Sequence, residues 1–120
     1  MKPSIYQALG KEKITQIITE FYQLAFQDPI IGHFFFRKDH DELLRGQLAF
    51  TLAMLGGEEA YRGRDVAAIH SHLAIRPPHF NRRQQLLKDI LVKHAVDAAI
   101  SSRWLRMEER LRQAIIGFVA

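Results

Sequence analysis

Apolar residues recur at spacings of three and four along most of this chain, a pattern that predicts helices. The clearest stretch on one helical face comprises Ile14, Ile17, Ile18, Phe21, Tyr22 and Ala25. Because residues three and four apart share a helix face, Tyr22 is expected on the buried side, beside Phe21. Asp28-Pro29 is expected to end this helix, because a residue that precedes proline disfavours the helical conformation.

Two capping boxes indicate where further helices begin. Ser4 followed by Gln7 predicts a short helix over about residues 5–9. Asp39 followed by Glu42 predicts a longer helix over about residues 41–55. One face of the longer helix carries Leu43, Gln47, Phe50 or Thr51, and Met54. Gln47 is therefore a polar side chain on an otherwise apolar face, and binding a nearby carbonyl group is one of the roles open to it.

The run Gly32-His33-Phe34-Phe35-Phe36 has no strand-like partner elsewhere in the chain. It is therefore predicted to be a turn whose phenylalanine side chains fill the core. Periodicity is poor from residue 58 to 78, where only a short helical turn around residues 66–70 is expected. So long a connection in so small a domain is commonly functional.

Two helices are predicted for the rest of the chain. Pro77-Pro78 begins the first, whose apolar residues are Phe80, Leu86, Leu87, Ile90 and Leu91. Asp97 caps the second, which is expected to carry Ile100, Trp104, Met107, Leu111, Ile115 and Phe118. The sum is an all-α protein with four substantial helices and two short ones.

The composition narrows the class of protein. The 120 residues contain no linker-like stretch, so one domain over residues 1–120 is expected. The absence of cysteine excludes a disulfide framework, a thiolate zinc site and an iron–sulfur cluster, so any metal must be bound by nitrogen or oxygen. Because no signal-peptide core and no membrane-length apolar run is present, we expect a soluble cytoplasmic protein.

The net charge of +4 leaves a second hypothesis open. A basic all-α interaction module could attract nucleic acid or an acidic protein through its long-range field. The basic residues are spread along the chain, with a modest concentration at Arg62, Arg64, Arg76, Arg82 and Arg83. An ordinary solvated basic face is the simpler interpretation, so no nucleic-acid partner is expected.

The six histidines do not show the spacing of a zinc site. His70 and His72 form the only close pair. Residues two apart on a helix point to different sides, so this pair seldom shares one ion. Taken alone, each histidine is more simply interpreted as a surface residue or a satisfied core residue than as a ligand.

Taken in order along the chain, however, a set of residues resembles the truncated haemoglobins, most closely their group I, or N-type, branch. The set comprises Phe21-Tyr22, Asp28-Pro29, Phe34-Phe35, Leu43, Gln47, Leu55-Gly56-Gly57, Tyr61-x-Gly63, Ile69-His70 and His79-Phe80. No single element is specific, but the ordered set spans nearly the whole chain.

The resemblance implies a two-over-two helical sandwich around non-covalent haem b, which is iron protoporphyrin IX, with His70 as the proximal iron ligand. His72 is the alternative ligand, but His70 stands at the family's distance from Phe80. Phe35 corresponds to the ring that packs against the haem. Further haem-lining residues are expected to be Leu43, Phe50, Ile69, Ile75, Phe80, Leu87 and Leu91, although the sequence alone does not separate haem lining from ordinary helix core.

Tyr22 and Gln47 correspond to the family's distal pair, which faces the bound gas. A phenol or amide donor there would strengthen the binding of partly negative dioxygen and slow its release. The alternative for Tyr22 is a half-buried side chain whose hydroxyl reaches solvent. Because Leu43 stands where a globin can carry a distal histidine, a five-coordinate iron is expected, with His33 and His40 as outside candidates for coordination.

The function implied by the resemblance is reversible binding of dioxygen, nitric oxide and carbon monoxide. Dioxygenation of nitric oxide to nitrate is an open enzymatic possibility. Such turnover needs a separate reductase, because the chain has no Gly-x-Gly-x-x-Gly motif for a nicotinamide or flavin cofactor. A monomer or weak dimer without a membrane partner is expected, and the basic interaction module without haem is the competing hypothesis.

Overall fold

The computed structural model describes residues 2–57 and 66–116, and all regular secondary structure in these ranges is helical. The elements are α1 (Ile5–Leu9), α2 (Lys11–Gln27), the 3₁₀ turn η1 (Gly32–Phe35), α3 (His40–Met54), α4 (Val66–His70), α5 (Pro77–Lys93), α6 (Ala98–Glu109) and α7 (Arg112–Ile116). The all-α prediction is therefore confirmed. Arg62, Arg64, the Tyr61-x-Gly63 motif and Phe118 lie outside the described residues.

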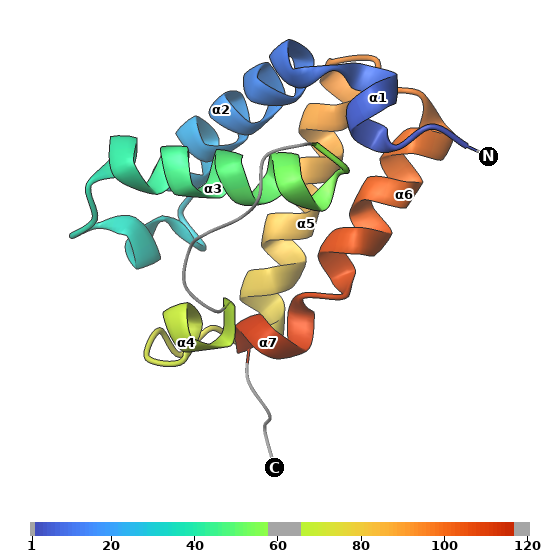
Figure 1. Cartoon of the computed structure of the whole chain (residues 1–120). Helices are drawn as coiled ribbons and strands as arrows, with labels where there is room; N and C mark the ends of the chain where they lie inside the picture. Colours follow the sequence, from blue (N-terminus) through green and yellow to red (C-terminus); the bar gives the residue numbers. More distant parts are fainter. Residues whose placement is uncertain (1, 58–65, 117–120) are drawn as a thin grey trace.

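Two pairs of helices form a sandwich. The helices α2 and α3 pack against each other, α5 packs beside α6, and the two pairs meet where α2 contacts α5 (Figure 1). At one end, α1 contacts both α2 and α6, and at the other end α4 packs against α7. No helix among the described residues is long and apolar enough to cross a membrane.

Local hydrogen bonds explain where the first helices begin and end. The Oγ atom of Ser4 accepts from the Gln7 amide at 3.0 Å, and Gln7 Oε1 accepts from the Ser4 amide at 2.8 Å, as the capping box predicts. Gly10 separates α1 from α2 with a φ of 85°, which a residue with a Cβ rarely adopts. After α2, Asp28 Oδ2 accepts from the Ile30 and Ile31 amides and fixes the turn.

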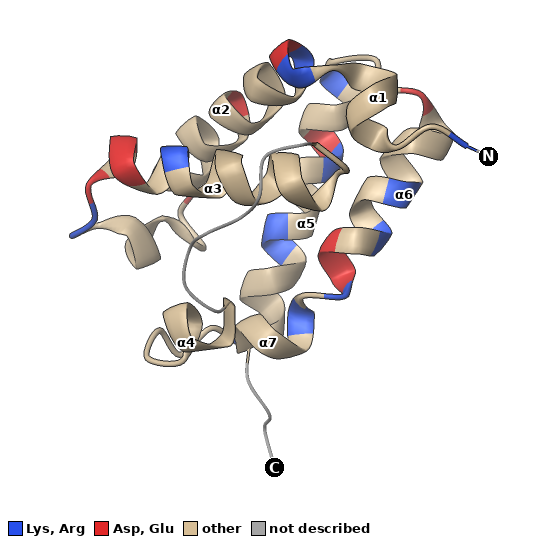
Figure 2. Ribbon diagram, viewed as in Figure 1, with Lys and Arg blue, Asp and Glu red and all other residues tan. Residues whose placement is uncertain are grey.

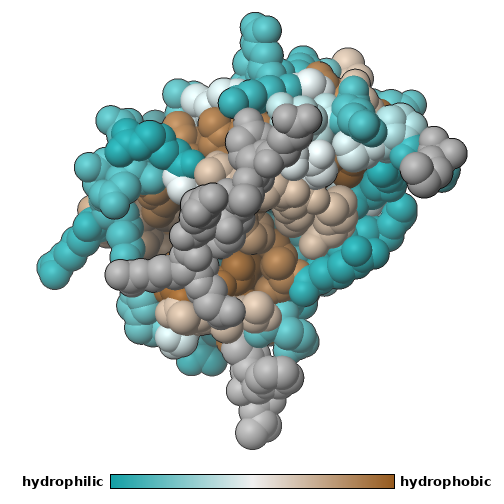
Figure 3. Space-filling view, viewed as in Figure 1, coloured by the Kyte–Doolittle hydropathy of each residue, from teal (hydrophilic) through white to brown (hydrophobic). Residues whose placement is uncertain are grey.

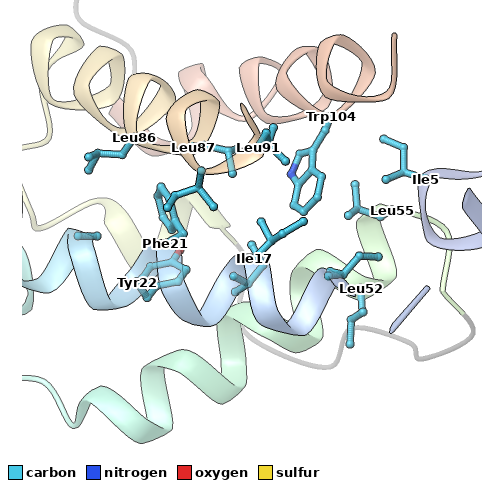
Figure 4. Close-up of a cluster of buried hydrophobic side chains, with 14 of the residues drawn as sticks. Ile5, Ile17, Phe21, Tyr22, Leu52, Leu55, Leu86, Leu87, Leu91 and Trp104 are labelled. Atoms are coloured by element: carbon cyan, nitrogen blue, oxygen red, sulfur yellow. The ribbon is translucent and has the colours of Figure 1, made fainter. Parts of the chain in front are cut away.

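The core lies between the two helix pairs (Figure 4). Ile17 and Phe21 of α2 lie opposite Leu87 and Leu91 of α5, and Trp104 of α6 closes this layer. All five side chains are at most 1 % exposed. Burying such side chains contributes about 1.5 to 3 kcal/mol each, so this layer is a main source of stability.

The structure corrects two expectations. The last predicted helix is two helices, because the chain turns at Arg110 and Leu111, where the Leu111 amide donates to the Glu108 carbonyl. Three phenylalanines that follow the Asp28 turn were expected to fill the core. The structure partly buries Phe34 and Phe35 but leaves Phe36 81 % exposed. The 3₁₀ turn ends at Phe35, so the chain directs the next side chain outward.

Candidate functional site

A cavity of about 480 Å³ lies between α2, α3, α4, α5 and α7. Its wall is mainly apolar, and Figure 3 shows apolar side chains reaching the surface between α3 and the α4–α7 end of the molecule. Cavities of this size and character are typical of cofactor sites.

The structure brings most of the predicted site residues to this cavity. Its wall includes Tyr22, Phe35, Leu43, Gln47, Phe50, Ile69, His70, Ile75 and Phe80. Leu87 and Leu91 do not line it, and they lie in the core layer beneath α2. Leu87 stands two helical turns beyond Phe80, which is about 10 Å farther along α5 and past the end of the cavity. Of the alternatives Phe50 and Thr51, Phe50 reaches the cavity and Thr51 is buried in the core.

His70 ends the short helix α4 with a defined ring orientation. Its Nδ1 atom lies 2.7 Å from the carbonyl oxygen of Val66. A carbonyl oxygen can only accept, so Nδ1 carries the proton and the lone pair of Nε2 is available to a metal. Burial lowers the pKa of His70, although its bond to the Val66 carbonyl opposes this effect, and the nearby charges of Arg83 and His72 lower the pKa further. The neutral, ligating form is therefore favoured.

His79 also lines the cavity, but its hydrogen bonding is the opposite of that of His70. The backbone amide of Arg76 donates to His79 Nδ1 at 2.9 Å at the start of α5. The neutral His79 ring therefore carries its proton on Nε2, which leaves that atom a donor and not a ligand. Of the two histidines on the cavity wall, His70 alone presents a free Nε2 lone pair.

The other histidines proposed as ligands lie outside the cavity. His72 is exposed, just beyond the end of α4. The ring of His40 stacks on Phe26 with centroids 3.9 Å apart, and its Nε2 donates to the Phe35 carbonyl. His33 is exposed and packs against Phe34. None of the three lines the cavity.

The donor set fits a haem iron better than a bare ion. In the described parts of the chain, no group of three or more His, Cys, Asp or Glu residues could hold a metal. A structural zinc site needs about four protein ligands and a catalytic one about three. A haem iron needs one axial imidazole, because the macrocycle supplies the equatorial ligands, and the apolar wall suits the porphyrin rings.

Tyr22 and Gln47, the predicted distal pair, are joined by a hydrogen bond. The hydroxyl of Tyr22 donates to Oε1 of Gln47 at 3.0 Å, linking α2 to α3 across the cavity wall. Tyr22 is only 5 % exposed, so its hydroxyl does not reach solvent as a half-buried tyrosine would. Burial is the main cause that raises the pKa of Tyr22, so the hydroxyl stays protonated.

The sequence interpretation missed two charged residues on the same wall. Arg83 of α5 and Glu108 of α6 line the cavity and form an ion pair with 3.0 Å between Nη1 and Oε2. The signal was available in the helical spacing, because Arg83 lies three residues after Phe80 and four before Leu87 on one apolar face. This is the same criterion that singled out Gln47.

Arg82 and Arg83, two of the arginines that the interaction-module hypothesis places on a basic surface, are both paired with carboxylates. Arg83 faces the cavity, and Arg82 donates two hydrogen bonds to Asp28 Oδ1, at 3.0 and 2.8 Å. In Figure 2 basic and acidic positions are interspersed along several of the described helices.

Comparisons with known proteins agree with this geometry. The family described as bacterial-like globin matches residues 4–116. A group 1 truncated haemoglobin of Tetrahymena pyriformis is 26 % identical over 115 residues, which covers 95 % of both chains. A further group 1 truncated haemoglobin, from Mycolicibacterium paratuberculosis, is 28 % identical over 103 residues, covering 85 % of this chain and 76 % of that protein.

Solved structures share the fold over nearly the whole chain. The Fe(III) form of the Tetrahymena pyriformis truncated haemoglobin has a TM-score of 0.90 at 25 % identity, covering 97 % of this chain and all of that one. The 2/2 haemoglobin of a Synechococcus species, at 20 % identity, has a TM-score of 0.88 and covers 95 % and 98 % of the two chains. The chain therefore belongs to the bacterial-like globins, as a two-over-two truncated haemoglobin most similar to group I.

Proposed function

We propose that this globin binds haem b through His70 and holds dioxygen, nitric oxide or carbon monoxide beside Tyr22 and Gln47. The observation that carries the proposal is the hydrogen bond from His70 Nδ1 to the Val66 carbonyl. It leaves Nε2 as the ligating atom on the wall of a largely apolar cavity. Haem, when bound, supplies an iron that takes one axial imidazole and a diatomic gas.

The residues around the cavity would contribute to haem packing and to ligand binding in different ways. Phe35 and Phe80 provide aromatic walls that pack against a porphyrin and exclude water. Tyr22 directs its proton to Gln47 Oε1, so the amide Nε2 of Gln47 is left to donate to a ligand.

Turnover of nitric oxide to nitrate is a second part of the proposal. This reaction oxidises the iron, so a separate reductase must return the electron. This part of the proposal is supported by the two polar side chains on the apolar cavity wall, Tyr22 and Gln47, which are hydrogen-bonded to each other and suited to hold a gas ligand in place. Nitric oxide consumption by the oxygen-bound protein, measured with an added reductase, tests this part independently of haem binding.

Haem titration of the apoprotein tests the binding proposal, with His70→Ala as the variant and His72→Ala as its matched control. His72 is two residues away, exposed and of the same type, so it reports any general effect of losing a histidine. We expect an intense Soret band in the wild type and in His72→Ala, and its loss in His70→Ala. An unchanged band in His70→Ala would overturn the proposed ligand.

A further inference from the structure

Arg83 is a cation on the wall of a cavity that is otherwise largely apolar. Its guanidinium lies 5.1 Å from the ring centroid of Phe21, and its side chain is only 19 % exposed. Holding a charge in such surroundings costs free energy unless the charge is paired. The cost of burying this charge indicates that Arg83 has a role other than ordinary core packing.

The counter-charge of Arg83 is held rigidly. Glu108 is 1 % exposed, its Oε1 accepts from Trp104 Nε1 at 3.2 Å, and its Oε2 pairs with Arg83. Arg83 Nη1 is buried and 3.0 Å from that carboxylate, but in the described part of the chain it has no acceptor in good hydrogen-bonding geometry. An N–H group on this atom is thus available to a further acceptor, and buried donors of this kind rarely stay unused.

Arg83 lines the same cavity as Tyr22 and His70. Its guanidinium lies over the ring of Phe21, the residue that precedes Tyr22 on α2. Burial alone would lower the pKa of Arg83, but the Glu108 carboxylate, together with Tyr22, raises it above the ordinary value. Arg83 is therefore charged at any physiological pH.

We propose that Arg83 makes the cavity beside Tyr22 an anion site, which accepts a small inorganic anion such as fluoride or nitrite as a ligand of the haem that His70 would hold. This inference rests on the proposed haem binding at His70. Guanidinium groups match the geometry of oxyanions, and hydrogen bonds to a charged acceptor are about twice as strong as neutral ones. Glu108 balances the charge of Arg83, so the site is neutral until the anion enters.

Absorbance titration of the ferric, haem-loaded protein with sodium fluoride and sodium nitrite tests the site. Arg83→Met should bind both anions about 10- to 100-fold more weakly, because it loses a charge-assisted hydrogen bond. Arg106→Met is the matched control, because it removes the same charge from an exposed position on α6 and should leave both affinities unchanged. Imidazole, a neutral ligand, should bind Arg83→Met as it binds the wild type.

Arg83→Met leaves Glu108 buried and unpaired, which could prevent folding. The double variant Arg83→Met with Glu108→Gln removes both charges and should fold, with the same loss of fluoride affinity. Glu108→Gln alone should bind fluoride more tightly than the wild type, because Arg83 then lacks its counter-charge. Opposite changes in the two single variants are a result that a purely structural ion pair would not give.

Two outcomes would overturn the inference. Equal changes in fluoride and imidazole affinity would mean that Arg83 controls only access to the cavity. Faster haem loss from the folded double variant, with unchanged fluoride affinity, would mean that Arg83 holds a haem carboxylate instead of an anionic ligand. Failure of the proposed function is recognised separately, because the wild type would then show no Soret band before any anion is added.

Discussion

The Tyr22 hydroxyl donates its proton to Gln47 Oε1, so a residue of α2 fixes the amide orientation of a residue of α3. The direction of this bond determines which atom can donate to a gas. Because Gln47 Oε1 accepts the Tyr22 proton, the Gln47 Nε2 atom is left to donate to a bound ligand. Tyr22 therefore acts partly by holding the Gln47 amide in this orientation.

Replacement of Tyr22 by Phe should therefore speed dioxygen dissociation from the ferrous protein. Without the Tyr22 hydroxyl, the Gln47 amide is no longer held in the orientation that donates to the ligand. Losing that hydrogen bond to a charged acceptor costs about 1.5 to 3 kcal/mol, which corresponds to a rate increase of about 10- to 100-fold. Stopped-flow displacement of dioxygen by carbon monoxide measures the rate. Gln47→Leu should show a comparable increase, and unchanged rates in both variants would show that the pair does not contact the ligand.

Neighbouring phenylalanines should differ sharply in their contribution to haem retention. Phe35 lines the cavity and packs against Tyr22 and Phe26, whereas Phe36 is 81 % exposed. Phe36→Ser should change the free energy of unfolding by about 0.5 kcal/mol or less, and Phe35→Ala should lower it by about 2 kcal/mol. Transfer of haem to an acceptor apoglobin should be faster in Phe35→Ala alone, and equal transfer rates would remove Phe35 from the haem contact.

Asp28 should make stability depend on acid pH. The Arg82 guanidinium is the main cause that holds the pKa of Asp28 below its usual range; the Ile30 and Ile31 amides also lower it, and burial opposes them. A depressed pKa in the folded state stabilises the fold above the ordinary carboxyl pKa, and this stabilisation is lost as pH falls through the folded-state value.

Asp28→Asn should therefore lose about 1 kcal/mol of unfolding free energy at neutral pH and show a smaller decline towards about pH 3. Urea denaturation at the two pH values measures both effects. Glu12→Gln, which removes an exposed carboxylate from α2, serves as the control. A decline as steep in Asp28→Asn as in the wild type would contradict the assignment.

Trp104→Phe should destabilise the protein beyond the loss of ring volume. Trp104 is fully buried and donates to Glu108, so phenylalanine would leave that carboxylate without its indole partner. The cost of an unsatisfied buried polar group is about 1 to 3 kcal/mol, and more where it is charged. Adding both Arg83→Met and Glu108→Gln to Trp104→Phe should recover part of this loss in urea denaturation, because the carboxylate that lacks its donor and the buried counter-charge are removed together.

Helix boundaries were predictable where a cap or a proline marks them. Ser4, Asp97 and Pro77 begin helices as expected, because each residue satisfies or removes an orphan amide at a helix start. The break at Arg110 and Leu111 was not predictable, because no glycine or proline marks it. The apolar spacing also continues through it, since Leu111 and Ile115 of the next segment face the cavity.

The apolar pattern singled out Gln47 as a polar residue on an apolar helix face, and the structure places it on the cavity wall. His70 was proposed only from the ordered family resemblance, because its own segment lacks clear periodicity, and it also lines the cavity. Arg83 was grouped with the other spread arginines as part of a solvated basic face. Adjacent residues on a helix point about 100° apart, so Arg82 reaches Asp28 while Arg83 faces inward to Glu108. The ion pair of Arg83 with Glu108 depends on how α6 packs against α5, and the residue pattern of α5 alone does not predict that packing.

Imidazole rescue of His70→Gly tests the central claim most directly, because it replaces only the proposed iron ligand. Haem binding to the His70→Gly apoprotein is measured by the Soret band with and without added imidazole. We predict that the variant binds haem poorly alone and that imidazole restores a spectrum close to that of the wild type. A wild-type spectrum without imidazole would show that another residue ligates the iron and would contradict the account.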